Sequence, residues 1–215
     1  MPAEAEGTLA RAFLDDRGKE ALRGAVRAVE ERSAAEVVIL VRERSGPYLH
    51  ASLLSGAIAA YLTLWFQLFS PWEYSLLLIQ LAPAVAGTAI GLLTSVLPDL
   101  QRLLTPGHIR ESYVRTKARA AFHDHGVADT RGRTGILVYV SRLEREAEVL
   151  ADRGVRDAVE AQAWEKAARA IRSAAGGRRP DAAALAITIA SLGDLLQPVL
   201  PRQAGDVNEL ADEPA

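Results

Sequence analysis

The chain has 215 residues, a net formal charge of −2 and a sequence pI of about 6.1, so no basic excess indicates nucleic-acid binding. It contains no cysteine, which excludes disulfides and thiolate chemistry and fits a reducing compartment. Aromatic residues make up 6% of the chain, too few to indicate a base-stacking platform.

The N-terminal piece predicts one helix and one strand. Apolar residues recur among charges over 8–32, which indicates an amphipathic helix with Thr8 as a cap, although Gly18 weakens it locally. This charged region lacks the short apolar core of a secretory signal. The run Glu36-Val-Val-Ile-Leu-Val-Arg-Glu43 then predicts a strand that is buried on both faces and needs partners elsewhere in the chain.

A long apolar stretch follows. Between His50 and Asp99, Glu73 is the only charged side chain, and Pro71-Trp72-Glu73-Tyr74 interrupts the stretch near its middle. The two limbs, 51–70 and 75–97, each reach the ~20 helical residues that cross a bilayer. We therefore expect a transmembrane hairpin. A buried helical pair in a soluble protein is the alternative, but a chain of this length cannot easily surround both limbs.

Lysine and arginine residues near the hairpin predict its orientation. They flank both limbs and are missing from the tip: Arg42 and Arg44 lie before it, and Arg102, Arg110, Arg115 and Lys117 after it. Both termini are expected to be cytoplasmic, and we expect a multi-pass protein of the cytoplasmic membrane. The basic residues after the second limb are also suited to contact lipid headgroups.

The C-terminal piece predicts the missing strands and their helices. Residues 108–122 are expected to form a helix, 135–141 and 147–151 two strands joined by a short turn, and 155–174 and 181–196 two further amphipathic helices. The last of these is too short to be a third span. The fold class is therefore α/β, with a small β-sheet between helix layers and a two-helix transmembrane hairpin as an interruption.

The predicted domains follow from this order. Residues 1–46 are the first part of the α/β domain, 47–107 the hairpin, 108–197 the second part, and 198–215 a disordered acidic tail. Small residues in the limbs allow them to pack closely or to form a homo-oligomer, and exposure to lipid is the competing explanation: Gly56, Ala60, Ala84, Gly87 and Gly91.

The segment from Gly132 to Val155 resembles the signature of the TPM domain family, named after a thylakoid lumen protein, a photosystem II repair protein and a worm receptor accessory protein. In that family, a loop enters a (N/T)-G-(V/I)-L strand, turns after a serine and returns to a strand ending in (A/G)-(D/x)-x-G-(I/L). Ser33-Ala-Ala-Glu36-Val-Val is similar to its opening S-x-x-E-(I/V)-V strand, and Ala121-Phe122 with Gly126 to its passage from helix to loop. The resemblance covers most of residues 8–197 and implies a TPM-like fold.

The resemblance implies several functions. Some members are described as acid phosphatases, some bind calcium, and others assist the assembly or repair of membrane complexes. A shared fold does not decide among these functions.

The candidate site residues are expected near one edge of the predicted sheet. Asp129 in the loop and Asp152 after the third strand can bind a divalent cation such as calcium, with oxygens from Thr130 and Thr134. Glu36, from the family's opening motif, is a weaker third carboxylate. The alternative is that Asp129 is a turn residue and that Asp152 caps the following helix.

Other charged groups near this loop have two interpretations each. Arg131, Arg133 and Arg153 can recognise phosphate, but surface pairing with Glu144, Glu146 or Glu148 is the more ordinary role. His123-Asp124-His125 is typical of a solvated helix end, because a structural zinc site needs more ligands than this segment offers.

Two functions are expected from these observations. The first is a binding or accessory module for a membrane protein complex, attached to the membrane and facing the cytoplasm. The alternative is a metal-dependent phosphatase at the membrane surface, although no D-x-D-x-(T/V), R-H-G or G-x-S-x-G stretch supplies a phosphatase or hydrolase motif. Catalytic residues, substrate and partner are not identified by the sequence.

Overall fold

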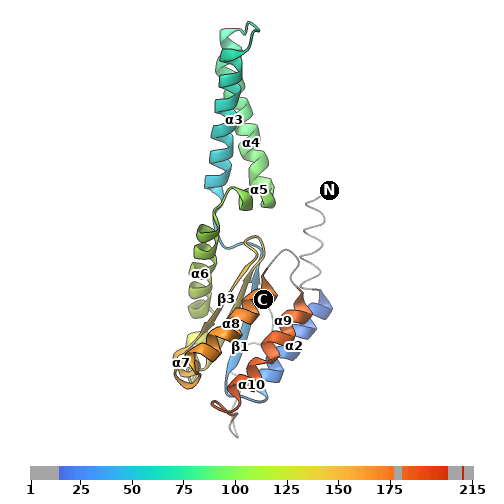
Figure 1. Ribbon diagram of the computed structural model, residues 1–215, viewed down its shortest axis with the longest axis vertical. Helices are drawn as coiled ribbons and strands as arrows, with labels where there is room; N and C mark the ends of the chain where they lie inside the picture. The colour runs from blue at the N-terminus through green and yellow to red at the C-terminus, as the bar shows by residue number, and fades with distance from the viewer. Residues whose placement is uncertain (1–14, 177–180, 203–209, 211–215) are drawn as a thin grey trace. The chain divides into compact units, whose positions relative to one another are not determined.

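The computed structural model describes residues 15–176, 181–202 and 210 (Figure 1). The chain divides into two compact units. One is formed by Met1–Ser45 together with Arg110–Ala215, and the other by Gly46–Ile109. The first contains a mixed sheet with helices, here called the α/β unit, and the second contains two long apolar helices, here called the hairpin unit.

The α/β unit contains a three-stranded sheet of order β1-β2-β3. β1 (Glu36–Arg42) runs parallel to β2 (Gly135–Ser141), and β2 runs antiparallel to β3 (Glu146–Ala151). The three strands predicted from the sequence are confirmed to within a residue at each end. β1 and β2 form because continuous β-branched and apolar runs allow burial on both faces.

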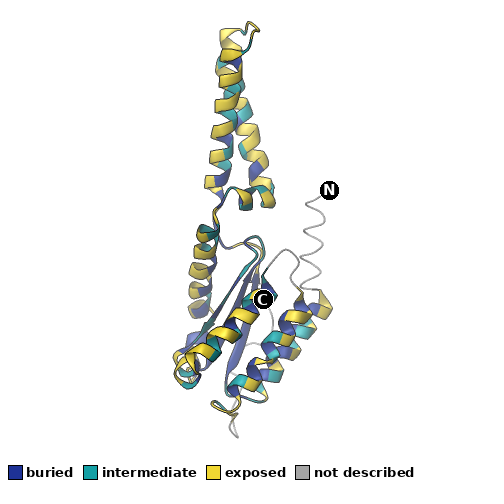
Figure 2. Ribbon diagram, in the orientation of Figure 1, coloured by how far each residue is buried: buried dark blue, intermediate teal, exposed yellow. Residues whose placement is uncertain are grey.

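Helices cover both faces of this sheet. Alternate side chains such as Val37, Ile39 and Val138 pack against residues of α2 (Asp16–Glu30), α8 (Ala161–Ala175), α9 (Ala182–Ala190) and α10 (Leu192–Leu196). The side chains on the other face of the sheet, including Leu40 and Leu137, pack against α6 (Gly107–Asp124) and the short 3-10 helix η1 (Val127–Asp129). The strands lie in the buried centre of the unit (Figure 2). The expected arrangement of a small sheet between helix layers is therefore observed.

The helix predicted over 8–32 differs from α2 in its described part. α2 starts after Asp15, whose carboxylate accepts a hydrogen bond of 2.6 Å from the Gly18 amide and caps the helix. The expected cap Thr8 lies outside the described residues. Leu22, Val26 and Val29 face the core at helical spacing, so the amphipathic pattern is confirmed over this part.

The single helix predicted over 155–174 is wrong, because α7 (Arg153–Ala158) and α8 are separate. Val159 has an extended backbone with φ −101° and ψ 137°, and its side chain is buried in the core together with Val155. Leaving the helix at this point allows both valines to reach the core. The sequence pattern did not show this break because Val155 and Val159 are also spaced as one helix turn.

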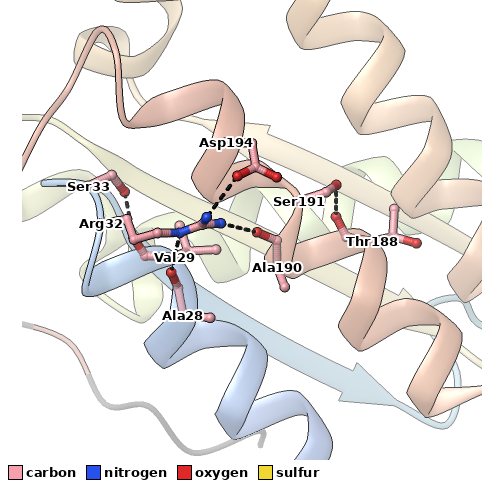
Figure 3. Close-up of polar contacts among 8 residues, drawn as sticks. All are labelled: Ala28, Val29, Arg32, Ser33, Thr188, Ala190, Ser191 and Asp194. Carbon is pink, nitrogen blue, oxygen red and sulfur yellow. Dashed lines mark hydrogen bonds and ion pairs between the residues drawn. The ribbon is translucent and has the colours of Figure 1, made fainter.

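The single helix predicted over 181–196 is also interrupted, at Ser191 between α9 and α10. Arg32, which follows α2, explains the break. Its guanidinium donates to the Ala190 carbonyl at 3.3 Å and to Asp194 Oδ1 at 2.8 Å, while its Nε donates to the Ala28 carbonyl at 3.2 Å (Figure 3). One cation thus satisfies the C-terminal carbonyls of two helices and connects them.

The predicted tail over 198–215 lies largely outside the described residues. Its first residues pair with the α/β unit, because the Ala34 amide donates to the Leu200 carbonyl at 2.9 Å and Ser33 forms an isolated antiparallel bridge with Pro201. This bridge places Leu200 and Pro201 beside the residues that enter β1.

The hairpin unit contains α3 (Leu49–Phe69), α4 (Leu76–Val96) and the short α5 (Pro98–Leu103). α3 and α4 are long and apolar enough to cross a membrane, as the limbs predict. In their 18-residue windows, 17% of residues in α3 and 6% in α4 are buried. A core helix of a soluble protein would be mostly buried, so these helices present their apolar side chains outward.

Glycines set the contact between α3 and α4. A Cβ added at Gly56 would lie 2.7 Å from the Gly87 carbonyl oxygen, and one added at Gly87 would lie 2.8 Å from the Gly56 carbonyl oxygen. The backbones therefore touch where side chains are missing. Of the alternatives left open by the sequence, close packing of the two limbs is the one that the structure shows.

Candidate functional site

The predicted site residues Glu36, Thr134 and Asp152 lie at one end of the sheet. Glu36 begins β1 in register with Gly135, which begins β2, and the Asp152 amide donates to the Gly135 carbonyl at 2.9 Å. Residues in register on adjacent strands have their side chains on the same face of the sheet. Glu36 and Asp152 therefore flank Gly135 on the face that α6 and η1 cover, and both are buried.

Gly135 allows the backbone of η1 to lie directly against the start of β2. A Cβ at this position would lie 2.1 Å from the Val127 carbonyl oxygen and 2.8 Å from Val127 Cγ1, so η1 sits directly on the start of β2. The close approach excludes every residue with a side chain. The glycine of the sequence signature is thus explained by contact with η1.

Thr130 and Thr134 use their hydroxyl groups to shape the loop that enters β2. The Thr134 amide donates to Thr130 Oγ1 at 3.0 Å, and Thr134 Oγ1 donates to the Ala34 carbonyl at 2.7 Å. Both threonines are buried. Their hydroxyl groups already make internal hydrogen bonds that connect this loop to the entry of β1.

Asp129 does not share this environment. It ends η1 and is exposed, whereas Asp152 is 8% exposed. Within residues 15–176, 181–202 and 210, no group of three or more His, Cys, Asp or Glu side chains is placed to hold a metal ion. The described carboxylates thus give a divalent cation such as calcium fewer ligands than it usually takes.

Asp152 has the carboxylate that is best placed to bind a further group. Its Oδ1 accepts a hydrogen bond of 2.7 Å from the Arg153 amide, the capping role considered from the sequence. Its Oδ2 is buried and has no hydrogen-bond partner in the described part of the chain, and Arg133 Nη1 lies 3.8 Å away. One carboxylate oxygen is therefore available to a donor or to a cation.

Arg133 has a strained backbone beside this oxygen. Its φ is +54°, a region that residues with a side chain rarely adopt. Two backbone hydrogen bonds hold it there, from the Arg133 amide to the Thr130 carbonyl at 3.0 Å and from the Gly154 amide to the Arg133 carbonyl at 2.8 Å. The surrounding loop thus fixes Arg133 next to Asp152.

The expected surface pairing of Arg133 and Arg153 with Glu144 is wrong, while the pairing of Arg131 stays a prediction. Arg133 instead pairs with Asp152, and Arg153 Nε pairs with Asp157 Oδ2 at 3.1 Å. Glu144 lies in the turn between β2 and β3, at the opposite end of the sheet, and is fully buried. The sequence placed it on the surface because a glutamate in a short turn is usually solvated.

Glu144 belongs to a second set of polar residues, here called the Glu144 cluster, which is formed by Ser45, Tyr139, Ser141 and Glu144. The Ser45 amide donates to Glu144 Oε1 at 2.9 Å, and the Ser141 hydroxyl donates to Glu144 Oε2 at 2.5 Å. Ser45 Oγ lies 2.6 Å from Ser141 Oγ and 3.1 Å from Tyr139 Oη. Polar residues at the end of an otherwise apolar strand were the available signal for this cluster.

His123 and His125 are exposed where α6 ends, and Gly126 follows with φ +66°. The His125 amide donates to the Ala121 carbonyl at 3.0 Å, which completes the last turn. The interpretation as a solvated helix end is confirmed.

The fold and its sites define a mixed α/β unit joined to two helices that are long and apolar enough to cross a membrane. The structure is similar to the NMR structure of the BA42 protein from the psychrophilic bacterium Bizionia argentinensis, with a TM-score of 0.55 and 16% sequence identity. The match covers 93% of this chain and 92% of that chain. At this identity the likeness concerns the fold alone. The sequence matches no protein-family model and no curated protein.

Proposed function

We propose that this chain is a membrane-anchored protein of the TPM type, whose α/β unit faces the cytoplasm of a bacterium and serves as a binding or accessory module for a membrane protein complex. The observation that supports it most is the outward exposure of α3 and α4. Apolar helices of this length with so few buried residues favour lipid as their surroundings. The signature between Gly132 and Val155 supports the family assignment.

A binding role agrees with the chemistry of the sheet end. A hydrolase needs an activated nucleophile or a metal-bound water. The threonine hydroxyls at the sheet end make internal hydrogen bonds, and Asp152 Oδ2 is a buried carboxylate oxygen there for which no hydrogen bond is observed among described residues. Recognition of a partner requires none of these catalytic groups.

A metal-dependent phosphatase is the second candidate, and the buried Asp152 Oδ2 is the observation in its favour. Asp152 and Glu36 would be the residues that hold the cation, which would supply a polarising charge at the sheet end. The neighbouring Arg133 disfavours a second cation at this position, because like charges repel at short distance.

Photo-crosslinking in intact membranes tests the binding role. The full chain with photoreactive residues at exposed positions of the α/β unit is compared with the full chain that carries them instead at exposed positions of α3 and α4. We expect one defined membrane protein to be crosslinked from the α/β unit and not from the two helices. Equal capture from both sets of positions, or no capture from the α/β unit, contradicts an accessory role for this unit.

Phosphate release from a small aryl phosphate tests the second candidate, a metal-dependent phosphatase. The full chain is compared with Asp152→Ala and with the matched control Asp157→Ala, whose side chain is 68% exposed. We expect no turnover by any of the three. Turnover that Asp152→Ala abolishes and Asp157→Ala keeps would replace the binding role by catalysis.

A further inference from the structure

The outer face of α6 has an unusual distribution of charge. Its inner face is apolar, because Val114, Ala118 and Phe122 are buried against the sheet. The outer stripe, here called the Arg115 face, consists of exposed hydrogen-bond donors at helical spacing: Ser112, Arg115, Thr116, Arg119 and His123. None of the five is acidic, and Glu111 is the neighbouring acid one turn before Arg115.

The two arginines of this face have no ion-pair partner in the described part of the chain. Several other arginines of the α/β unit do, since Arg153 pairs with Asp157 and both Arg169 and Arg172 pair with Glu165. Arg115 and Arg119 are four residues apart on one helix, and like charges at this spacing destabilise a helix. An anionic partner would remove this repulsion.

The position of α6 in the chain identifies the partner. α6 begins at Gly107, and only α5 and short connections separate it from the end of α4 at Val96. The first residues of α6, up to Ile109, belong to the same compact unit as α4 and follow its end after only ten residues. If α4 crosses a bilayer, the first turns of α6 lie within reach of its headgroups.

We propose that the Arg115 face binds the headgroups of anionic phospholipids in the bilayer that α3 and α4 span. The inference rests on the proposed membrane insertion and deepens it, because it names the surface that contacts lipid outside the hydrocarbon. Arginine forks and hydroxyl donors match phosphate oxygens, which accept several hydrogen bonds at once. The apolar inner face meanwhile holds α6 on the sheet, so the contact fixes the α/β unit to the membrane surface.

The full chain in lipid nanodiscs tests this proposal. Because the sequence has no cysteine, Ala120→Cys beside the face accepts a single fluorescent label. Quenching by a headgroup spin-labelled lipid is compared between phosphatidylcholine discs and discs that also contain phosphatidylglycerol. We expect stronger quenching with phosphatidylglycerol, lost at roughly 1 M salt, where the Debye length falls to ~3 Å.

Two variants make the test specific. Arg115→Gln with Arg119→Gln should weaken the preference for phosphatidylglycerol by about 25-fold, since each arginine near an anionic surface contributes about fivefold. The matched control, Arg156→Gln with Lys166→Gln, removes two exposed cations from α7 and α8 and should keep the preference. Equal quenching in both lipids, or equal loss in the control, overturns the proposal. A chain that stays out of the discs overturns membrane insertion and this inference with it.

Discussion

Glu144 shows how a single buried carboxylate can organise one end of a sheet. Its two oxygens accept hydrogen bonds from the backbone of Ser45, which follows β1, and from the hydroxyl of Ser141, which ends β2. Ser45 is also the last residue of the α/β unit before the chain enters the hairpin unit. Glu144 therefore fixes the exit of the chain to the sheet together with the contacts of the Ser45 hydroxyl to Ser141 and Tyr139.

Replacing Glu144 by alanine should destabilise this end of the sheet by roughly 2–4 kcal/mol, because two buried donors lose their acceptor. Glu144→Gln should cost less, about 1 kcal/mol, since it keeps a carbonyl and a similar volume. Native-state hydrogen exchange of β2 amides in the full chain measures both effects. Glu148→Ala on β3 is the control, and an equal effect there would contradict the role given to Glu144.

Replacing each of two glycines by alanine should change the stability of the α/β unit in opposite directions. Gly135→Ala should destabilise the α/β unit by about 3 kcal/mol or more, because its Cβ would meet a backbone oxygen at 2.1 Å. Gly24→Ala should stabilise it by about 0.5–1 kcal/mol, because Gly24 is exposed within α2 and a Cβ there meets nothing within 4 Å. Hydrogen exchange in the same unit measures both. Changes of the same sign would contradict these assignments.

At the residue scale, the sequence predicted Glu36, Thr134 and Asp152 together because each borders a strand, and strand ends can be recognised from apolar runs. The exposure of Asp129 and the burial of Glu144 were not predictable in this way. Both lie in turns, where burial depends on how η1 and the β2–β3 connection pack. Local pattern does not contain that information.

At the scale of elements, strands and apolar limbs were predicted well, and the amphipathic C-terminal helices were not. A strand that is buried on both faces and a helix that is apolar on all sides each give a continuous run of apolar residues with clear ends. The breaks at Val159 and Ser191 are instead set by tertiary contacts, namely a valine that enters the core and the guanidinium of Arg32. A distant arginine cannot be inferred from the helix that it interrupts.

The contact between α3 and α4 gives a prediction about these two elements. Ser55 Oγ lies 2.7 Å from Thr94 Oγ1, so cysteines at both positions should form a disulfide under oxidation in membranes. Adding Gly87→Leu should reduce the yield several-fold, because its Cβ meets the Gly56 carbonyl oxygen at 2.8 Å and Ala60 Cβ at 3.0 Å. Gel mobility without reductant measures the yield. The control is Ala89→Leu, an exposed position on α4, and an equal loss there would contradict the glycine contact.

At the scale of the whole molecule, the two units differ in what buries their apolar surface. Both hydrophobic clusters of the α/β unit consist of residues from its two chain segments and include none from the hairpin unit. α3 and α4 leave most of their apolar surface outward. The α/β core is therefore complete in itself, while the hairpin unit needs another apolar environment.

This difference predicts the result of removing the hairpin unit. Replacing residues 46–109 by a flexible glycine-serine linker should leave an α/β unit that is soluble without detergent, because no core side chain is lost. The loop entropy of the linker grows only slowly with its length, so several lengths should succeed. Dispersed amide resonances and cooperative thermal unfolding would show a folded unit. The full chain provides the comparison, since it should stay with membranes after alkaline extraction. A linker variant that is unfolded at every length would mean that the hairpin unit contributes to the fold, and a full chain released by alkali would mean that the apolar helices do not cross the bilayer.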